Sequence, residues 1–404
     1  MKIGYICTLL LITVFLNPAI SSTMTAQPLQ IEVSAENFDR SETLVSFDVN
    51  DMVEPGSYHL ISATGDTTLL QVESDGRGYF ILDDLSRGEV ARYSIGHRVD
   101  VDENIFEVDK DSSTLTFHLR GKRILSYFHG LNNPPEELGH RYRRSGYIHP
   151  VYSPGGTALT NHLDVSMHPH HSGIWSAWPN TEFERRNPDF WNVHLNSGRV
   201  DQIGKIELLD GGEIFTGFRS KHRYVDLSAS DPVKALEEEW IVRIYGHLIP
   251  GYFMFDLEAV QKAEPNRPLH LPEYRYGGVA FRGSESWNDP ERVFFLTSDG
   301  QGREGDGSRI RWLAIYGKVE GSMAGIVIMD HPSNVRHPQP IRMHPETPYV
   351  NFSPVKLGSM TIENGKPYRA EYRYVTFDGE PNSERIERIW RDYAYPPDVQ
   401  IIEQ

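Results

Sequence analysis

Residues 240–260 read WIVRIYGHLIPGYFMFDLEAV and are the clearest indication of the fold. Within this stretch, residues 240–245 and 252–260 alternate between apolar and polar side chains, and a period of two is typical of a half-buried β-strand. The same alternation recurs in residues 114–120, 312–316 and 368–377. Because no helical pattern alternates with these strands, residues 113–400 predict one large β-sandwich rather than a parallel α/β fold.

A second, smaller β domain is predicted for residues 29–105. Short strand-like pieces are separated there by the turn signals Pro55-Gly56, Gly65-Asp66, Asp75-Gly76 and Arg87-Gly88. This spacing favours a small sandwich of the immunoglobulin or fibronectin kind. The acidic stretch 100–111 is expected to be a linker or an edge strand. The fold class predicted for the whole chain is therefore all-β.

One short helix is expected near the C-terminus, over residues 384–393. Ser383 is placed to cap it, and Ile386, Ile389 and Trp390 form an apolar stripe at helical spacing.

The N-terminus has the pattern of a secretory signal peptide. Lys2 precedes an apolar run over residues 3–16, a helix-breaking Asn17-Pro18 and small residues that suit cleavage after residue 21 or as late as residue 26. The alternative is a retained membrane anchor, although the run is short for a span of about 20 residues. The single cysteine, Cys7, lies in this segment, so the mature chain is expected to lack thiols. That suits a bacterial periplasm or exterior, and we expect an exported protein.

The composition of the chain disfavours several classes of function. Hydrophobic residues make up 39% of the chain, enough for a substantial core, and 40 Lys and Arg against 56 Asp and Glu give a formal charge of −16. An acidic surface repels a phosphate backbone, which disfavours nucleic acid as a partner. The absence of GxSxG, P-loop, HExxH and CxxC motifs leaves lipase, NTPase, zincin and thioredoxin functions without support.

The most informative segment is residues 161–171, NHLDVSMHPHH. At period two, one face carries apolar side chains and the other carries His162, Asp164, Ser166 and His168, which predicts a strand with an unusual polar face. His170 and His171 follow in a turn, and Trp175 and Trp178 come next. Histidine suits proton transfer, metal binding or contact with sugar hydroxyls, and tryptophan suits sugar ring faces. We therefore assign catalysis to His170 and His171 and substrate binding to His168, Trp175 and Trp178. The alternative is that these histidines satisfy a polar core or a turn.

Two further segments contribute candidates. Residues 330–338, DHPSNVRHP, offer His331, Asn334 and Arg336 for binding and His337 for catalysis, unless they form an ordinary proline-stiffened loop.

In residues 272–283, Glu273 lies among aromatic residues, which would raise its pKa enough for it to act as a catalytic acid or base. Arg282 in the same segment is a candidate for substrate binding. The alternative is that Glu273 is an edge-strand carboxylate paired with Arg275 or Arg282.

Residues 168–175, HPHHSGIW, and 189–191, DFW, resemble the "HPHHRGLW … DFW" signature of the PmoA-like, or methane-oxygenase-like, family. Residues 330–338 and 372–379 are similar to later landmarks of that family, and Ser172 departs from the usual arginine. The resemblance covers most of residues 30–395. It implies a galactose-mutarotase-like supersandwich, an architecture in which sugar-active proteins use His and Glu on a concave sheet face. Oxygenase chemistry does not follow, because the mature chain lacks the membrane spans that it needs.

The leading hypothesis is an exported carbohydrate-active enzyme, either a glycoside hydrolase or a polysaccharide or oligosaccharide lyase. His170 or His171 would act as acid or base with Glu273 as the carboxylate counterpart, while Arg336 and His337 orient the substrate. One alternative is a non-catalytic glycan-binding protein. Another is a metalloprotein that holds zinc or copper through His162, His168 and His170. The enzyme hypothesis requires no cofactor, and a divalent metal belongs to the last alternative.

Overall fold

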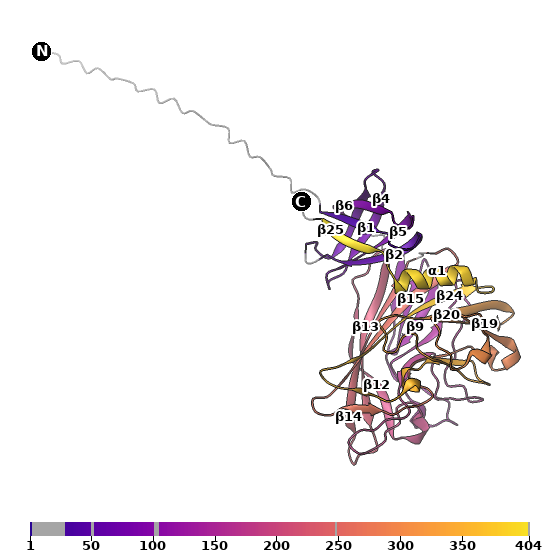
Figure 1. Ribbon diagram of the computed structural model, residues 1–404. Coiled ribbons are helices and arrows are strands. Elements are labelled where there is room, and N and C mark those ends of the chain that lie inside the picture. Colours follow the sequence, from indigo (N-terminus) through magenta and orange to yellow (C-terminus); the bar gives the residue numbers. More distant parts are fainter. Residues whose placement is uncertain (2–28, 50–51, 101–104, 247–248, 403–404) are drawn as a thin grey trace.

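The computed structural model describes residue 1 and residues 29–49, 52–100, 105–246 and 249–402. It is built from antiparallel sheets, so the all-β fold class is confirmed. Figure 1 shows a small domain, mostly indigo, at one end of a larger β domain, with the helix α1 lying where the two meet.

The small domain is one continuous seven-stranded sheet. Its order is β2 (Arg40–Asp48), β5 (Arg77–Leu85), β4 (Thr67–Val72), β3 (Gly56–Ser62), β6 (Val90–Val99), β1 (Gln30–Ser34) and β25 (Asp398–Ile402). The expected immunoglobulin-like strands are thus present, but they share one ladder instead of forming two separate sheets. Ile31, Val33 and Phe80 are buried in the core that this sheet encloses. The last strand, β25, comes from residues assigned by sequence to the large domain and pairs with β1.

The large domain contains two eight-stranded sheets. The first large sheet has the order β21 (Ile341–Met343), β22 (Tyr349–Phe352), β17 (Gly278–Arg282), β11 (Ile174–Ala177), β10 (Tyr147–Val151), β9 (Lys122–Phe128), β8 (Thr114–Leu119) and β7 (Phe106–Lys110). The second large sheet has the order β12 (Gly198–Leu208), β13 (Phe215–Asp226), β14 (Val233–Tyr245), β15 (Tyr252–Ala263), β24 (Tyr368–Asp378), β20 (Ser322–Asp330), β19 (Trp312–Val319) and β18 (Val293–Thr297). A short pair, β16 (Leu269–Leu271) and β23 (Met360–Ile362), lies apart from both.

Single turns of 3-10 helix connect several strands. They are η1 (His140–Tyr142), η2 (Val193–Leu195), η3 (Glu285–Trp287), η4 (Pro290–Arg292), η5 (Arg303–Gly305) and η6 (Pro354–Leu357).

The period-two pattern decides which side chains enter the core. In β15, Phe253, Phe255 and Leu257 are buried between the two large sheets, and Asp256 and Glu258 point to the outer face of the second large sheet. This is the alternation read from residues 252–260, and the outer face that it produces is unusually rich in charge.

A buried polar network joins the two large sheets from inside. Gln261 on β15 donates to Glu238 on β14 at 2.7 Å and to Ser176 on β11 at 3.1 Å, and it accepts from Trp178 Nε1 at 2.7 Å. Glu238 also contacts His222 Nδ1 at 3.2 Å. Because buried polar groups must be paired, these bonds fix how β11 lies over the second large sheet.

The predicted helix is confirmed as α1 (Ser383–Ala394), with Ile386, Ile389 and Trp390 buried. Its cap was assigned wrongly: Asn382, not Ser383, accepts from the backbone N–H of Arg385 at 2.9 Å. An asparagine side chain one residue earlier reaches the third helical N–H equally well, and sequence alone does not separate the two.

The two domains are tied together by a buried glutamine. Gln71 on β4 donates to the carbonyls of Asp210 and Phe215 at 2.8 and 3.1 Å, and its carbonyl oxygen accepts from the backbone N–H groups of Ile214 and Phe215. Tyr79 packs on Phe215 with ring centroids 4.8 Å apart. The small domain is therefore docked by specific polar contacts as well as by apolar ones.

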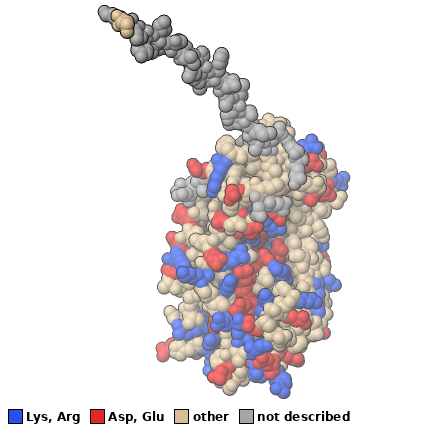
Figure 2. All heavy atoms as spheres, turned by 90° about the vertical axis from the view of Figure 1, so that its left-hand side faces the viewer, with Lys and Arg blue, Asp and Glu red and all other residues tan. Residues whose placement is uncertain are grey.

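Several sequence predictions concern the ends and the surface. Residues 2–21 of the predicted signal peptide lie outside the described residues, as do residues 101–104 of the acidic stretch, whereas residues 106–110 form the edge strand β7. In the described part of the chain, no helix combines the length and the apolar character needed to cross a membrane. Figure 2 shows basic and acidic side chains interspersed over the face in view.

Replacement of Gln71 by alanine should destabilise the domain contact. It leaves the buried backbone N–H groups of Ile214 and Phe215 unpaired, and each unsatisfied group costs about 1–3 kcal/mol. We expect the free energy of unfolding from urea titration to fall by more than 2 kcal/mol, a value of the same order as that cost. Gln400→Ala, on the exposed side of β25, is the control. Equal stability of both variants would contradict a structural role for Gln71.

Candidate functional site: a histidine pocket

Four neighbouring strands of the first large sheet end at the same edge. In this antiparallel order, Ile174 pairs with Phe281, Arg282 pairs with Tyr349, and Met343 pairs with Val350. The start of β11, the end of β17, the start of β22 and the end of β21 therefore meet. Segments far apart in the sequence are brought to one place by this register.

On β11, β17 and β22, every second side chain points away from the second large sheet. Trp175 pairs with Ala280 and Arg282 pairs with Tyr349, so Trp175, Arg282 and Tyr349 share a face. Ser176 points the other way and reaches Tyr224 of the second large sheet at 2.9 Å. The site therefore lies on the outer face of the first large sheet.

The segment that carries the histidines is a loop, which corrects the strand predicted for residues 162–168. Leu163 and His168 have left-handed φ angles of 51° and 53°, and Val165 is exposed rather than packed. The side chain of Asp164 accepts from the backbone N–H and hydroxyl of Ser166 at 2.9 and 2.6 Å. Aspartate side chains often hydrogen-bond nearby backbone groups, and here such a turn forms in place of strand pairing.

The loop is anchored by a buried ion pair. Arg282 Nη2 contacts Asp164 Oδ2 at 2.6 Å, and Asn288 Nδ2 donates to the same oxygen at 2.7 Å. Burial alone would raise the pKa of Asp164, but the bonds from Ser166 and Asn288 and the charge of Arg282 lower it. Asp164 is thus a stable anion that holds the loop against the end of β17.

Gly173 allows the loop to enter β11. It has φ of 52°, and a Cβ atom there would lie 2.0 Å from the carbonyl oxygen of Ile148. Any other residue would collide with β10, so the tight approach requires glycine.

Three histidines converge at the end of this loop. Ring nitrogens of His168, His170 and His171 lie within 4.8 Å of one another. Their ring centroids are separated by 4.5 to 5.6 Å, and two further rings adjoin them: His344 lies 5.1 Å from His168 and His194 lies 5.5 Å from His170. Five imidazoles therefore surround one small volume.

The surroundings lower the pKa of four of these imidazoles, those of His168, His170, His171 and His344. Burial lowers the pKa of His170 to about 3, with further lowering from His168 and His194, and burial lowers the pKa of His171 well below its usual value. Burial also lowers the pKa of His344 to about 4. The Nδ1 atom of His171 is buried and has no hydrogen-bond partner among the described residues. A neutral imidazole with an unpaired nitrogen is suited to bind a metal ion or a ligand N–H or O–H.

The pocket that these residues line has a volume of about 310 Å³. Its walls comprise His168, His170, His171, Trp191, Asn192, His194, Arg275, Tyr276, Arg342, His344 and Tyr349. Arg342 pairs with Asp306 at 2.8 Å, whereas Arg275 lies over the Tyr276 ring at 5.4 Å without an ion pair among the described residues. None of the described residues that line the pocket is a carboxylate.

The predicted site residues from residues 161–178 fall into three positions. His168, His170 and His171 line the pocket. Trp175 is fully buried behind it, with its ring 5.1 Å from His171, and Trp178 faces the second large sheet. His162 lies outside the group of three: it stacks on His149 at 4.1 Å and contacts Tyr147 Oη through Nδ1 at 3.0 Å. His171 therefore takes the place predicted for His162 in a possible metal-ligand set.

The predicted candidates in residues 330–338 lie away from the pocket. Asn334 donates to Asp330 and to the carbonyl of Glu371, and His337 Nδ1 contacts Asp330 at 2.8 Å. Arg336 donates to the backbone carbonyls of residues 354, 358 and 359. These contacts hold the loop together, and His331 lines a different cavity, described below.

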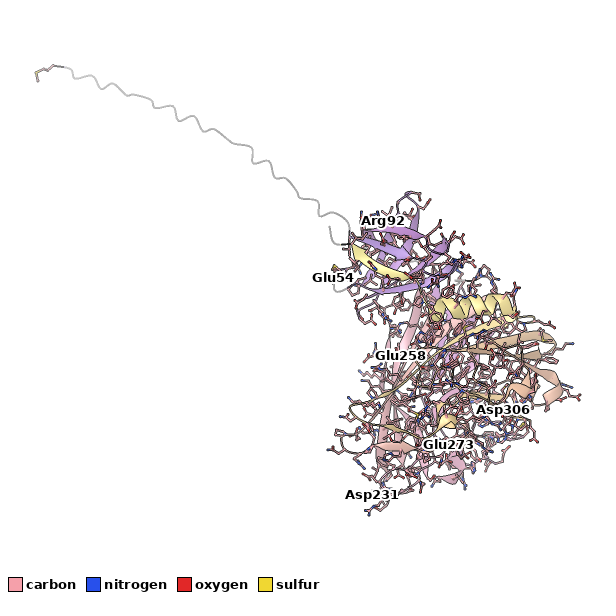
Figure 3. All side chains as sticks on the ribbon, in the orientation of Figure 1. Glu54, Arg92, Asp231, Glu258, Glu273 and Asp306 are labelled. Atoms are coloured by element: carbon pink, nitrogen blue, oxygen red, sulfur yellow. The ribbon has the colours of Figure 1, made fainter. Side chains whose placement is uncertain are left out.

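Two other predicted residues have different positions from those assigned. Arg282 is completely buried and acts on the histidine loop through Asp164. Glu273 does not line the pocket, and Figure 3 shows it in the half of the large domain that lies away from the small domain.

The sequence interpretation missed eight lining residues, which are Trp191, Asn192, His194, Arg275, Tyr276, Arg342, His344 and Tyr349. Trp191 had a usable signal, since it belongs to the DFW motif, and Asn192 and His194 follow that motif directly. The others come from separate strands and loops, and nothing local to them indicates a shared site.

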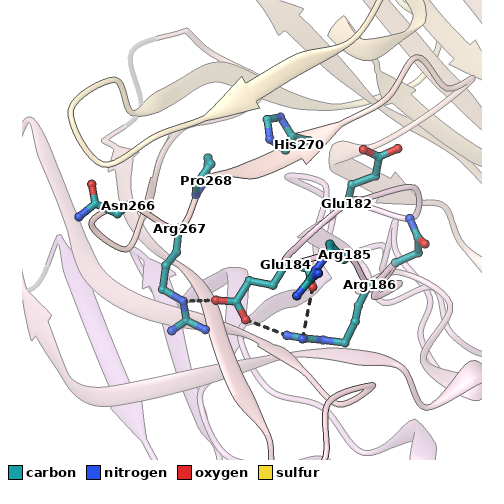
Figure 4. Close-up of a pocket in the computed structure, with 9 residues that line it drawn as sticks. Glu182, Glu184, Arg185, Arg186, Asn266, Arg267, Pro268 and His270 are labelled. Atoms are coloured by element: carbon teal, nitrogen blue, oxygen red, sulfur yellow. Dashed lines mark hydrogen bonds and ion pairs between the residues drawn. The ribbon is translucent and has the colours of Figure 1, made fainter.

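A second surface pocket of about 530 Å³ lies beside β16 (Figure 4). Glu184 bridges Arg267 and Arg186 there at 2.5 and 3.0 Å, and Arg186 also pairs with Asp226. Arg186 and Arg267 are thus neutralised by the exposed Glu184 and the buried Asp226.

Fold and site together define a two-domain β-sandwich protein with a histidine pocket at one sheet edge. The chain belongs to the family described as "Family of unknown function (DUF6807)", whose model matches residues 114–391. Among curated proteins no significant match was found.

Two solved structures are similar at low identity. The crystal structure of heparan sulfate lyase HepC from Pedobacter heparinus is 11% identical, with a TM-score of 0.34. A mutant of the same lyase is 10% identical, with a TM-score of 0.33. Each match covers 71% of this chain and 38% of the other chain.

The Arg282–Asp164 pair should be essential for stability. Arg282→Met leaves Asp164 as an unpaired buried charge, and breaking such a pair costs about 3–5 kcal/mol. Arg292→Met is the control, because its ion pair with Asp289 is exposed and such pairs contribute about 0–1 kcal/mol. Urea unfolding measures both, and a loss at Arg282 no larger than that at Arg292 would contradict the assigned role.

Proposed function

We propose that the protein is carbohydrate-active and that its histidine pocket binds an acidic sugar and cleaves its glycosidic linkage by elimination. The observation that carries this proposal is the composition of the pocket: imidazoles, phenols and guanidinium groups, with no carboxylate among the described lining residues. Hydrolysis of glycosides commonly uses a pair of carboxylates. The motif resemblance to sugar-active, mutarotase-like proteins supports the substrate class.

Elimination from a uronate needs three functions that the pocket offers. A cation beside the carboxylate makes the C5 proton more acidic, and Arg275 is the pocket guanidinium without an ion pair among the described residues. A base removes that proton, and the electron pair forms the C4–C5 double bond as the C4–O bond breaks. An acid then supplies a proton to the departing oxygen.

The hydrogen bonds of the pocket residues indicate which of them could act as donor, base and acid. His344 Nδ1 accepts from the backbone N–H groups of Glu346 and Thr347 at 3.2 and 3.1 Å, so its ring proton lies on Nε2 and His344 serves as a donor. His194 is a lining imidazole outside the group of three and is the base in this proposal. Tyr349, whose buried hydroxyl has no partner among the described residues, is the acid.

A metal ion is the second candidate feature, favoured by the convergence of His168, His170 and His171. Nitrogen ligands lie about 2.0–2.1 Å from zinc. The three histidines each offer a ring nitrogen, and these nitrogens lie within 4.8 Å of one another. A divalent ion there would supply a further positive charge for the sugar carboxylate.

Arg275→Met should lower the rate constant kcat/KM for a uronate substrate by roughly 10- to 100-fold, the range expected for loss of a charge-assisted bond. The measurement is NMR of acidic and neutral oligosaccharides incubated with the protein, in which elimination gives a new unsaturated ring proton. Arg185→Met, in the other pocket, is the control.

The same spectra separate the alternatives. A new reducing end without an unsaturated proton would replace elimination by hydrolysis. Selective line broadening without product would leave a glycan-binding protein.

Metal content is measured independently of activity. After reconstitution with Zn²⁺ or Cu²⁺ and removal of excess ion, elemental analysis should find about one ion per chain, the number that a three-histidine site holds. His168→Ala, His170→Ala and His171→Ala should each lose it. His162→Ala should retain it, because His162 lies outside the group of three. Loss of metal in the His162 variant alone would overturn this assignment.

A further inference from the structure

Another cavity lies between the two domains, on the outer face of the second large sheet. Its volume is about 380 Å³, within the range of roughly 300–1,000 Å³ typical of small-ligand pockets. It is lined by residues of β2 and β5 of the small domain, of β14, β15 and β24 of the large domain, and of α1. Figure 3 shows Glu258, one of the lining residues, on the side of the large domain nearest the small domain. We call this cavity the interdomain crevice.

Two glutamates face each other across adjacent strands in the crevice. Glu258 on β15 is the direct register partner of Glu371 on β24, so their side chains leave the same face side by side. The neighbouring partners Asp256 and Arg373 form a bidentate ion pair at 2.7 and 2.8 Å. The like-charged pair is therefore not neutralised by that arginine.

The two glutamates have different surroundings. Glu258 forms an ion pair with the exposed Arg369 at 3.2 Å. Glu371 lies 3.5 Å from His331 Nδ1, an atom that makes a shorter contact of 2.7 Å with Ser333. Burial, followed by the charges of Asp256 and Glu258, raises the pKa of Glu371 to about 7. The carboxyl group of Glu371 can then donate a hydrogen bond near neutrality.

Other titratable and charged groups face Glu371 from the elements around it. They are Asp256 and Glu258 on β15, Arg373 on β24, Arg243 and Tyr245 on β14, Arg77 and Tyr79 on β5, His331 after β20, and Asp392 and Tyr393 on α1.

Tyr393 supplies an independent indication of a ligand. It lines the crevice, its side chain is 6% exposed, and its hydroxyl has no hydrogen-bond partner among the described residues. Its ring is held firmly, with Arg373 Cζ 4.3 Å above it and His331 at 4.7 Å. A buried hydroxyl without a partner costs free energy, and a ligand hydroxyl would satisfy it.

We propose that the interdomain crevice is a second ligand site, which binds a neutral saccharide through Glu258, Glu371 and Tyr393. A sugar hydroxyl donates to Glu258 and accepts from the carboxyl group of Glu371, and Tyr393 completes the set. Tyr79 and Tyr245 add aromatic surface, which suits the C–H faces of sugar rings. This site goes beyond the histidine pocket and needs none of its residues.

Charge argues against the other classes of ligand. An anion would meet the carboxylates of Glu258 and Asp392, and two of the three lining arginines, Arg243 and Arg373, are already paired with Glu73 and Asp256. A metal ion needs several donor atoms that converge on one point. Among the described residues, such a group of three candidate ligands is found at the histidine pocket and not in the interdomain crevice.

The test is binding of neutral sugars by saturation-transfer NMR and calorimetry. The probes are methyl β-glucoside, methyl β-galactoside, methyl α-mannoside, cellobiose and lactose. The wild-type affinity should be about tenfold weaker at pH 8 than at pH 6, because a group with a pKa of about 7 loses about nine-tenths of its protonated form over that interval. Glu371→Gln keeps a neutral donor, so its affinity should not change with pH.

Two variants complete the test. Tyr393→Phe removes a hydroxyl that has no partner among the described residues, so it should fold normally and bind roughly three- to tenfold more weakly. Glu237→Gln, on the same sheet face but outside the crevice lining, should bind as the wild type does. Thermal unfolding confirms that each variant is folded. Absence of binding by all five sugars, or binding that neither Glu371→Gln nor Tyr393→Phe alters, would overturn the proposal.

Discussion

The buried contact between Arg282 and Asp164 determines the shape of the histidine pocket. A guanidinium group removed from water loses several kcal/mol of solvation unless a carboxylate compensates it. Asp164 provides that charge at 2.6 Å and at the same time closes a turn with Ser166. The chain between residues 161 and 173 must follow the geometry of these bonds, and the turn that results directs His168, His170 and His171 toward the sheet edge. The pocket is thus a consequence of where one arginine sits at the end of β17.

The fold was largely predictable because its dominant signal is local. Each strand of the large domain alternates between the core and the outside, so residues such as Phe253 and Phe255 indicate both the strand and its buried face. The same rule failed at residues 162–168, because alternation there reflects a turn built by Asp164 rather than strand pairing. Counting hydrophobic and polar positions does not reveal when a side chain hydrogen-bonds its own backbone. The pairing of β25 with β1 of the small sheet was also not predictable from the sequence, because it joins residues from opposite ends of the chain.

The candidate site was predictable only in part for the same reason. Three pocket histidines are neighbours in the sequence, so their clustering could be read directly. Arg342 and Tyr349 reach the pocket through the order β11, β17, β22, β21, and that order is a property of long-range pairing. Orientation was a second difficulty. Trp175 and Trp178 differ by three positions, which places them on opposite faces of the first large sheet, and neither lines the pocket.

The arrangement of polar groups explains why both candidate sites lie outside the sandwich. Between the two large sheets, Gln261, Glu238 and their partners form hydrogen bonds with one another, so these groups are already satisfied without a ligand. The outer faces differ, because loops or the small domain cover them incompletely and leave open pockets there. One outer face gathers imidazoles and guanidinium groups, and the other sets two carboxylates in register. We therefore propose an anionic ligand for one pocket and a neutral hydroxyl-bearing ligand for the other, because the local pairing of side chains differs between them although the net charge of the chain is the same.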